Sequence, residues 1–259
     1  SIMALTFTNK AAHEMKERIM QLVNASEARN VWMGTFHSIF ARILRIEAEK
    51  IGFTSNFSIY DTDDSKALIT QILKDLSLDT KVYPPKQVLS RISSAKSSLF
   101  SPEDYANNPE IQEADRKANK PLIAQLFKHY NERLHRANAM DFDDILYFTN
   151  ILLRDNPDVL YKYQNRFKFI LVDEYQDTNF AQYLIVKRIA ALFENICVVG
   201  DDAQSIYAFR GANIQNILNF KNDYPDYKLI RLEQNYRSTQ NIVNASNSVI
   251  AHNKDQIKK

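Results

Sequence analysis

The sequence predicts an α/β protein, in which a parallel sheet carries a large all-helical insertion. Short apolar runs alternate with helical patterns near both ends of the chain, as in sheets whose strands are joined by helices. Between about residues 43 and 167 only helical patterns occur, and turn signals such as Pro84-Pro85 separate them. A chain of 259 residues can hold two modest domains of this kind.

Four apolar runs have the composition of strands. The first, third and fourth are continuous rather than alternating, which is typical of strands buried on both faces of a parallel sheet. Thr8-Asn9 follows the first run and is a candidate N-cap for a helix. The expected strands are Ile2–Phe7, Val31–Gly34, Phe167–Val172 and Ile196–Val199, with Leu229–Leu232 as a weaker fifth.

The central region is expected to be helical because its apolar residues recur at helical spacing. The polar segment Pro102–Asn119 is expected to be a mobile loop. The acidic residues Asp141, Asp143 and Asp144 resemble a metal site, but capping of a helix start explains them better. The expected helices are Ala67–Leu76, Gln87–Ser97, Leu122–Ala137 and Asp144–Leu153.

Composition excludes several classes of protein. No apolar run approaches the ~18 residues that cross a bilayer, and the first residues lack the pattern of a signal peptide. They have the composition of a strand already under way, so we expect the chain to begin inside a larger, cytoplasmic protein. The single Cys197 excludes an internal disulfide and a cysteine zinc site, and its apolar neighbours predict a buried thiol. A net charge of +2 gives no argument for a nucleic-acid partner.

Two strand ends carry residues suited to phosphate chemistry. Asp173 and Glu174 directly follow the third run; there an Asp can hold Mg²⁺ and a Glu can polarise a water for attack on phosphorus. Gly200 ends the fourth run, and Gln204 beyond it can reach a phosphate or the attacking water. An isolated Asp-Glu pair is more often a capped helix start, but two such strand ends favour a functional edge.

Aromatic, basic and hydroxyl side chains follow other strand ends. Tyr207 and Phe209 alternate around a small residue beside Arg210, an arrangement that suits unstacked bases and phosphates, although two core aromatics are the alternative. Tyr236 and Arg237 also stand side by side, and an arginine can stabilise a transferring phosphate. Hydroxyl, amide, aromatic and imidazole groups that suit a nucleic-acid backbone occur at Thr6, Phe7, Asn9, Thr35 and His37.

Five strings carry a family resemblance: TFTNKAA, GTFHS, ILVDEYQDTN, VVGDDAQSIYAFRGA and LEQNYRS. They resemble, in the same order, the motifs of the UvrD/Rep/PcrA family of superfamily 1 DNA helicases, with a long helical insertion between the second and third. The run AMDFDD resembles a family segment at the end of that insertion. The resemblance covers essentially the whole chain and implies the sheet of a RecA-like P-loop NTPase, here without its first strand and P-loop.

The resemblance implies a role in ATP hydrolysis for five residues. Asp173 is expected to bind Mg²⁺, and Glu174 to be the catalytic base that activates water. Gln204 is expected to sense the γ-phosphate, Arg237 to contact it, and Tyr236 to stack on the adenine. ATP and Mg²⁺ are therefore the expected cofactors.

The resemblance also implies a path for single-stranded DNA. Bases are expected to stack on Phe7, Tyr207 and Phe209. Phe209 stands where the family commonly has tryptophan, so stacking is expected to persist with a smaller contact area per base. The other residues expected along the path are Thr6, Asn9, Thr35, His37 and Arg210.

The implied organisation is a discontinuous motor domain at residues 1–42 and 168–233, an insertion at 43–167 and the start of a second RecA-like domain at 234–259. The implied activity is 3′-to-5′ movement on single-stranded DNA and at junctions with duplex, in repair or replication. The four glycines include no G-x-x-x-x-G-K-[ST] loop, so this chain alone is expected to lack significant ATPase activity. A missing strand would expose apolar surface, so self-association is expected of such a truncated piece.

Three alternatives stay open. The chain can belong to the helicase subunit of a RecB/AddA-type nuclease, which Phe209 fits equally well. It can be a non-enzymatic fragment that only binds single-stranded DNA. The weakest alternative is a metal-dependent nuclease that uses Asp173-Glu174 and Asp201-Asp202.

Overall fold

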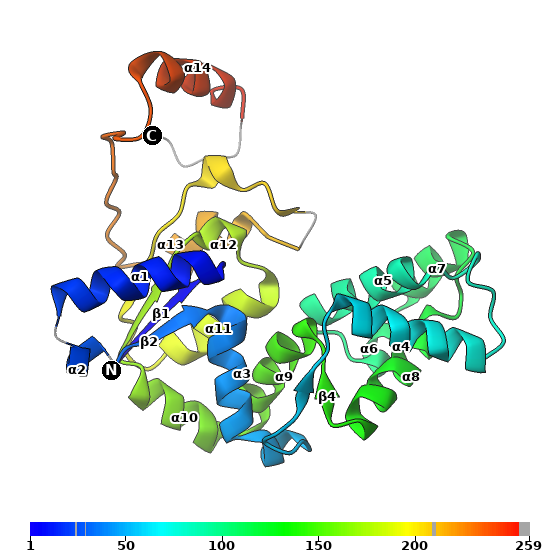
Figure 1. The fold of residues 1–259 in the computed structure, drawn as a ribbon. Coiled ribbons are helices and arrows are strands. Elements are labelled where there is room, and N and C mark those ends of the chain that lie inside the picture. Colours follow the sequence, from blue (N-terminus) through cyan, green and yellow to red (C-terminus); the bar gives the residue numbers. More distant parts are fainter. Residues whose placement is uncertain (24, 29, 209–210, 254–259) are drawn as a thin grey trace.

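A four-stranded parallel sheet organises the first and last thirds of the chain, in the order β2-β1-β5-β6. The computed structural model describes residues 1–23, 25–28, 30–208 and 211–253 (Figure 1). The predicted α/β class and parallel sheet are confirmed. The strands are β1 Ile2–Thr6, β2 Trp32–Thr35, β3 Ser58–Ile59, β4 Ala139–Met140, β5 Phe169–Val172 and β6 Ile196–Val198.

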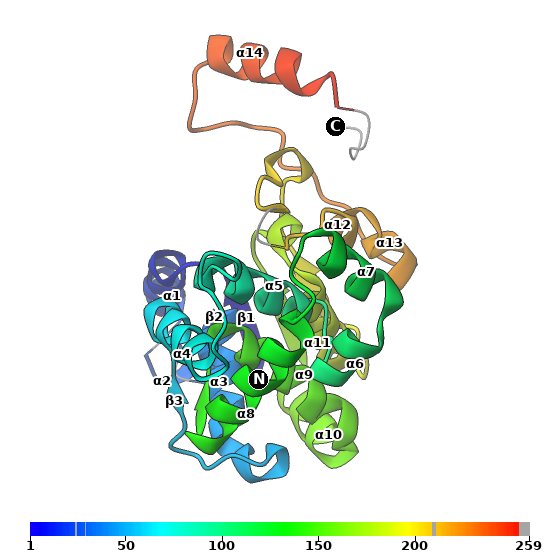
Figure 2. The ribbon, with the colours of Figure 1, turned by 90° about the vertical axis from the view of Figure 1, so that its right-hand side faces the viewer.

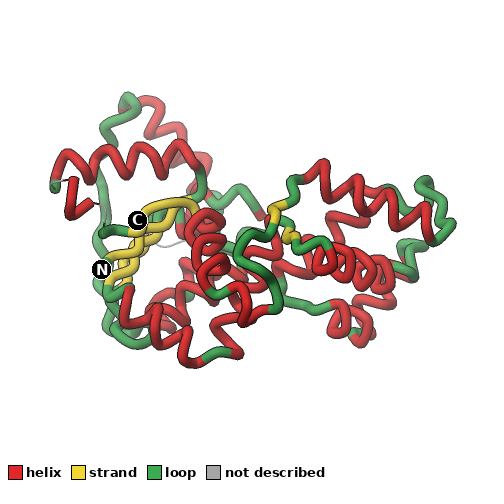
Figure 3. The backbone as a smooth tube through the Cα atoms, turned by 60° about the horizontal axis from the view of Figure 1, so that its bottom comes forward, coloured by secondary structure: helices red, strands yellow, loops and turns green. Residues whose placement is uncertain are grey.

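Helices make up most of the remaining chain (Figure 3). α1 packs on β1 and β2, whereas α3 and α11 contact the sheet at β2, β1 and β5. Figure 1 shows α1 on the side of the sheet opposite to α3 and α11. The α-helices are α1 Asn9–Leu22, α2 Ala25–Ala28, α3 Phe36–Ile46, α4 Thr62–Asp75, α5 Pro85–Ser97, α6 Pro102–Asn107, α7 Pro109–Lys117, α8 Ile123–Arg136, α9 Phe142–Asp155, α10 Pro157–Arg166, α11 Phe180–Ala190, α12 Gln215–Leu218, α13 Phe220–Asp223 and α14 Gln240–Ile250. Short 3₁₀ turns are η1 Ala48–Ile51, η2 Tyr175–Asp177 and η3 Asp202–Gln204.

The strands of the main sheet all end at one edge. In register, Thr6 lies beside Thr35, Leu5 beside Val172, and Val172 beside Val198. Parallel strands need long crossovers, and helical segments provide each of them here. The residues that follow the four strands therefore gather along a single edge, where ligands bind in open α/β sheets.

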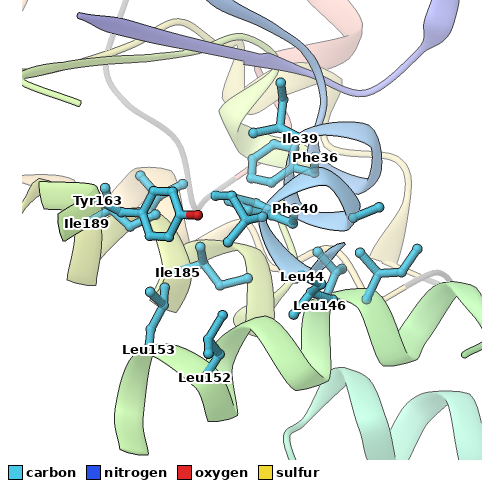
Figure 4. Close-up of a cluster of buried hydrophobic side chains, with 14 of the residues drawn as sticks. Phe36, Ile39, Phe40, Leu44, Leu146, Leu152, Leu153, Tyr163, Ile185 and Ile189 are labelled. Atoms are coloured by element: carbon cyan, nitrogen blue, oxygen red, sulfur yellow. The ribbon is translucent and has the colours of Figure 1, made fainter. Parts of the chain in front are cut away.

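The core beneath the sheet is built from α3, α9, α10 and α11. Figure 4 shows Phe40 of α3, Leu152 of α9 and Ile185 of α11 pointing toward one another, and each is fully buried. Burial of one such side chain contributes roughly 1.5–3 kcal/mol. This packing fixes α9 and α10 against the sheet, although both lie within the predicted insertion of residues 43–167.

A second core lies inside a separate helical lobe, formed by α4 to α8 (Figures 1 and 3). Its buried side chains run from Ile69 to Ala139, and Phe127 and Tyr130 are fully buried among them. β3 and β4 pair in parallel where the chain enters and leaves the lobe. These two-residue strands were not predicted, because they are too short to show a periodic pattern. The predicted helices of this region are confirmed as α4, α5, α8 and α9.

The prediction of a mobile loop at Pro102–Asn119 is wrong, because the segment forms α6 and α7. Ser101 and Asn108 cap the two helices, and each cap is followed by proline at the first helical position. Tyr105 is buried and donates a hydrogen bond of 2.6 Å to Asp115. The polar composition thus serves caps and an internal hydrogen bond.

The weak fifth strand at Leu229–Leu232 is also wrong, since the segment has no regular secondary structure. Ile230 is 81% exposed and Leu232 is 87% exposed. A strand is stabilised by a neighbour to pair with and a surface to pack on, and the described residues offer this segment neither.

Half of one sheet face is open. Phe169 and Leu171 of β5 are 52% and 41% exposed, whereas Ile170 and Val172 on the other face are buried. α1 covers β1 and β2 on the open side but packs on neither β5 nor β6 to a comparable extent. The expectation of strands buried on both faces is therefore wrong for β5 and β6. Cys197, predicted to be buried, is exposed on β6 for the same reason.

Among the residues that the structure describes, no helix combines the length and the apolar character that crossing a membrane requires.

Candidate active site at the carboxyl edge of the sheet

The turn after β5 presents two carboxylates. The Asp173 N–H donates to the Leu5 carbonyl at 3.0 Å, which extends the pairing with β1 by one residue. Glu174 then adopts a left-handed backbone with a φ of 52°, and its N–H donates to Asp173 Oδ1 at 3.0 Å. A non-glycine residue rarely adopts this conformation, and such residues cluster at functional sites. The Glu174 side chain in this turn is exposed.

Negative charge is concentrated at this turn. Burial, and then the charge of Glu174, raises the pKa of Asp173, and the same two causes raise the pKa of Asp177. Asp177 Oδ1 is buried and has no hydrogen-bond partner in the described part of the chain. Crowded carboxylates of this kind are stabilised by an added cation.

The turn fits a magnesium ion bound largely through a substrate. Within the described ranges, no three His, Cys, Asp or Glu side chains are grouped so that they could hold a metal ion. Mg²⁺ commonly takes only one or two carboxylates and completes its shell with phosphate oxygens and water. Asp173, partly buried at the strand end, is suited to be that single carboxylate.

The turn after β6 lies directly beside the first. The Val199 N–H donates to Val172 O at 2.8 Å, and the Tyr175 N–H donates to Val199 O at 2.9 Å. A Cβ on Gly200 would lie 2.5 Å from Gln176 Oε1, so a side chain at position 200 would displace the Gln176 amide from this place. Beyond it, Gln204 is exposed and its Nε2 donates to Asp201 Oδ2 at 2.9 Å. The structure therefore brings the loops of Glu174 and Gln204 to one edge.

Gln176 was given no role from the sequence, although it lies inside the ILVDEYQDTN string. It is 1% exposed, and its side-chain amide contacts both Glu174 and the backbone of Asp201. The available signal was a neutral amide placed among carboxylates immediately after an apolar strand.

The end of β1 presents an aromatic ring and a buried hydroxyl. Thr6 is 2% exposed, and its Oγ1 has no partner among the described residues. Phe7 is half-buried and packs on Phe36, with ring centroids 5.4 Å apart. Thr8 caps α1 as predicted by accepting from the Ala11 N–H at 3.1 Å, which leaves Asn9 exposed in the first turn.

The end of β2 is engaged within the protein. Thr35 caps α3, and its Oγ1 accepts from the Ser38 N–H at 3.2 Å. The His37 ring lies against the Phe142 ring at 5.4 Å and hydrogen-bonds the Phe142 backbone. Burial lowers the pKa of His37 below its usual value, and the hydrogen bond opposes this only in part. His37 thus joins α3 to the start of α9.

The remaining predicted residues lie farther along the chain. Tyr207 is 40% exposed beyond η3, whereas Phe209 and Arg210 lie outside the described residues. Tyr236 is 92% exposed, and its neighbour Arg237 is also exposed. They precede α14, which stands apart from the sheet in Figures 1 and 2. The structure does not bring these two residues together with Asp173 and Glu174.

Comparison with known proteins agrees with this architecture. Residues 1–225 match the UvrD/REP helicase N-terminal domain family. A curated relative from Leuconostoc citreum, named ATP-dependent DNA helicase PcrA, is 47% identical over 100% of this chain and 34% of its own length. A relative of the same name from Staphylococcus epidermidis is 49% identical over 99% of this chain and 34% of its own length. A third relative of the same name, from Staphylococcus aureus, is 47% identical over 99% of this chain and 34% of its own length. The chain thus spans about a third of these relatives.

Proposed function

We propose that this chain, which belongs to the UvrD/REP helicase N-terminal domain family, is the nucleotide-sensing and DNA-gripping part of a cytoplasmic ATP-dependent DNA helicase. Its curated relatives are named ATP-dependent DNA helicase PcrA, and they are about three times as long, since the chain covers 34% of their length. The observation that supports the proposal most is the single edge at which β2, β1, β5 and β6 all end. Each of the four strands leads there into one of the motif strings.

ATP hydrolysis is proposed at the turns after β5 and β6, on a RecA-like sheet. Asp173 would hold Mg²⁺, which neutralises phosphate charge when it is bound. Glu174 would accept the proton of the water that attacks the γ-phosphorus, and ADP would leave as the P–O bond breaks. Gln204 would contact the γ-phosphate from the neighbouring loop. Arg237, with Tyr236 on the adenine, would join the site when the segment that carries α14 closes over it.

Single-stranded DNA, including its junctions with duplex, is proposed to pass the ends of β1 and β2 and the segment after η3. Exposed Tyr207 and half-buried Phe7 are suited to stack on bases, as proposed also for Phe209. The remaining polar groups of the proposed path are Thr6, Asn9, Thr35, His37 and Arg210. Movement from 3′ to 5′ rests on the family resemblance.

The proposed domain division keeps a motor domain at residues 1–42 and 168–233, an insertion at 43–167 and the start of a second motor domain at 234–259. The separate core of the lobe between Ile69 and Ala139 supports an inserted helical unit. Side chains from Met140 to Phe167 pack in the core beneath the sheet instead. They would anchor the insertion to the motor domain.

The hydrolytic role can be tested in a polypeptide of the relatives' length that contains this chain. With single-stranded DNA present, Glu174→Gln should lower kcat for ATP by about 10²–10⁴-fold, because the general base is lost. Glu194→Gln is a matched control, since Glu194 is also exposed and has a similar φ of 53°. Equal activities of the two variants would refute the assignment. Unwinding of a tailed duplex only from a 5′ tail would refute the polarity.

The isolated chain gives a second test. It contains no G-x-x-x-x-G-K-[ST] loop, so no steady-state ATP turnover is expected from it. It should still bind single-stranded DNA without nucleotide, and Tyr207→Ala should weaken binding by about 1–3 kcal/mol per stacked base. Tyr161→Ala on α10, where Tyr161 is 63% exposed, is the control and should bind normally. Turnover by the chain that Glu174→Gln abolishes would contradict the first expectation.

A further inference from the structure

We infer that Gln176 is a positioning residue, whose side-chain amide fixes the Glu174 carboxylate relative to the loop of Gln204. This inference rests on the proposed function of that edge. Gln176 Nε2 donates to Glu174 Oε2 at 2.8 Å, and Gln176 Oε1 accepts from the Asp201 N–H at 3.1 Å. One planar amide therefore joins the turns that follow β5 and β6.

Only one orientation of this amide satisfies both contacts. The Asp201 backbone N–H can only donate, so the oxygen of Gln176 must face it. The Glu174 carboxylate can only accept while it is ionised, so the nitrogen of Gln176 must face that side. A glutamate at position 176 would keep the first contact and lose the second, and a methionine would lose both. The two contacts can therefore be separated by substitution.

The surroundings hold Gln176 in place. Its side chain is 1% exposed, and its backbone carbonyl accepts from Ser205 Oγ at 3.2 Å. Gly200 leaves the space that Oε1 occupies, since a Cβ there would lie 2.5 Å from that oxygen. A fixed support of this kind sets the position of a flexible side chain beside it.

The contacts continue to the residue proposed to sense phosphate. Asp201 Oδ1 accepts from the Ala203 N–H at 3.1 Å, and Asp201 Oδ2 accepts from Gln204 Nε2 at 2.9 Å. A chain of hydrogen bonds thus runs from Glu174 through Gln176 and Asp201 to Gln204. The water to be activated must lie between the base and the γ-phosphate, and small misplacements of either group slow such a reaction strongly. Gln176 should therefore affect the rate of hydrolysis and leave ATP binding intact.

The kinetic test uses a polypeptide of the relatives' length and two substitutions. Gln176→Glu and Gln176→Met should each lower kcat by about 10–100-fold, as losses of supporting residues around active sites commonly do. The KM for ATP should stay at the wild-type value. Gln182→Glu is the matched control, because Gln182 is 5% exposed and its Oε1 accepts the Asn179 N–H, a contact that glutamate keeps. A wild-type kcat in both Gln176 variants would overturn the inference.

A double substitution shows whether Gln176 acts through Glu174. If it does, adding Gln176→Met to Glu174→Gln should cause no further loss in single-turnover rate, because the two losses are not additive. A further loss equal to that of Gln176→Met alone would overturn the inference. If Glu174→Gln by itself leaves turnover intact, the proposed function fails instead.

The bridge can also be tested without activity, in the 259-residue chain. Hydrogen–deuterium exchange at the Asp201 amide should become faster in Gln176→Met, which lacks the acceptor. It should stay slow in Gln176→Glu, which keeps the acceptor, and in Gln182→Glu. Unchanged exchange in Gln176→Met would show that Gln176 does not hold this loop, whatever the reaction at the site.

Discussion

Replacing Lys96 by methionine tests how the helical lobe is held against the start of α9, which packs on the core beneath the sheet. Lys96 Nζ, near the end of α5, lies 2.8 Å from Asp141 Oδ2 and 2.7 Å from Asp144 Oδ1 at the start of α9. The side chains of the three residues are only 0%, 6% and 2% exposed. Burial alone lowers the pKa of Lys96, but the two carboxylates raise it overall, so the ammonium stays charged.

The expected cost follows from this burial. Removing one partner of a buried ion pair costs about 3–5 kcal/mol, because the other partner is left buried without compensation. Methionine fills most of the volume of the lysine stem, so a cavity adds little. We therefore expect Lys96→Met to lower the free energy of unfolding by about 3–5 kcal/mol.

A surface pair provides the control. Lys66 pairs with Asp63 at 3.0 Å, but these side chains are 38% and 90% exposed, so Lys66→Met should cost at most about 1 kcal/mol. Urea unfolding of the chain at pH 7.5, followed by far-ultraviolet circular dichroism, measures both. Equal stability of the two variants would show that the buried pair does not fasten the lobe.

Two further predictions concern pH and self-association. Burial, and then the charge of Asp141, raises the pKa of Asp144 from 3.8 to about 7. The folded chain therefore holds this proton more tightly than the unfolded chain, so the contribution of Asp144 to stability should fall as the pH rises from about 4 to 7, in the same direction as that of Asp143, whose pKa burial raises to about 6. Asp144→Asn should flatten this fall, and urea midpoints at pH 5 and pH 7 would measure it; equal slopes would contradict the assignment. The open sheet face around Phe169 and Leu171 should make the isolated chain self-associate, and Leu171→Lys should reduce this. Light scattering over a range of concentrations would measure the molar mass of the particles, and a stable monomer of the unmodified chain would contradict the prediction.

The four strands of the main sheet could be predicted because each is a local property of the sequence. A continuous apolar run bounded by polar residues located β1, β5 and β6 to within one or two residues. Which faces these strands bury could not be predicted, because coverage depends on where α1 packs. Cys197 and Leu171 are examples: both are apolar residue types that are usually buried, yet both are exposed here.

The candidate site likewise has features that could be predicted from the sequence and features that could not. The adjacency of the turns at Glu174 and Gln204 followed from parallel strands that end at one edge. The contacts of Gln176 could not be predicted, because Asp201 lies 25 residues away and the contact depends on the course of two turns. The pairing of Lys96 with Asp141 spans 45 residues, and the sequence showed only a capped helix start. Capping by Asp141 is confirmed, but the buried cation was missed.

The start of α9 is where the lobe and the carboxyl edge of the sheet meet. Asp141 and Asp144 hold Lys96 of the lobe, while Phe142, between them in sequence, contacts His37 at the end of β2. The core beneath the sheet fixes the rest of α9, so this first turn cannot follow the lobe without disturbing one of the two contacts. A displacement of the lobe should therefore reach the proposed DNA path through Phe142 and His37. On this reasoning, the buried ion pair at Lys96 preserves the shape of that path as well as the stability of the lobe.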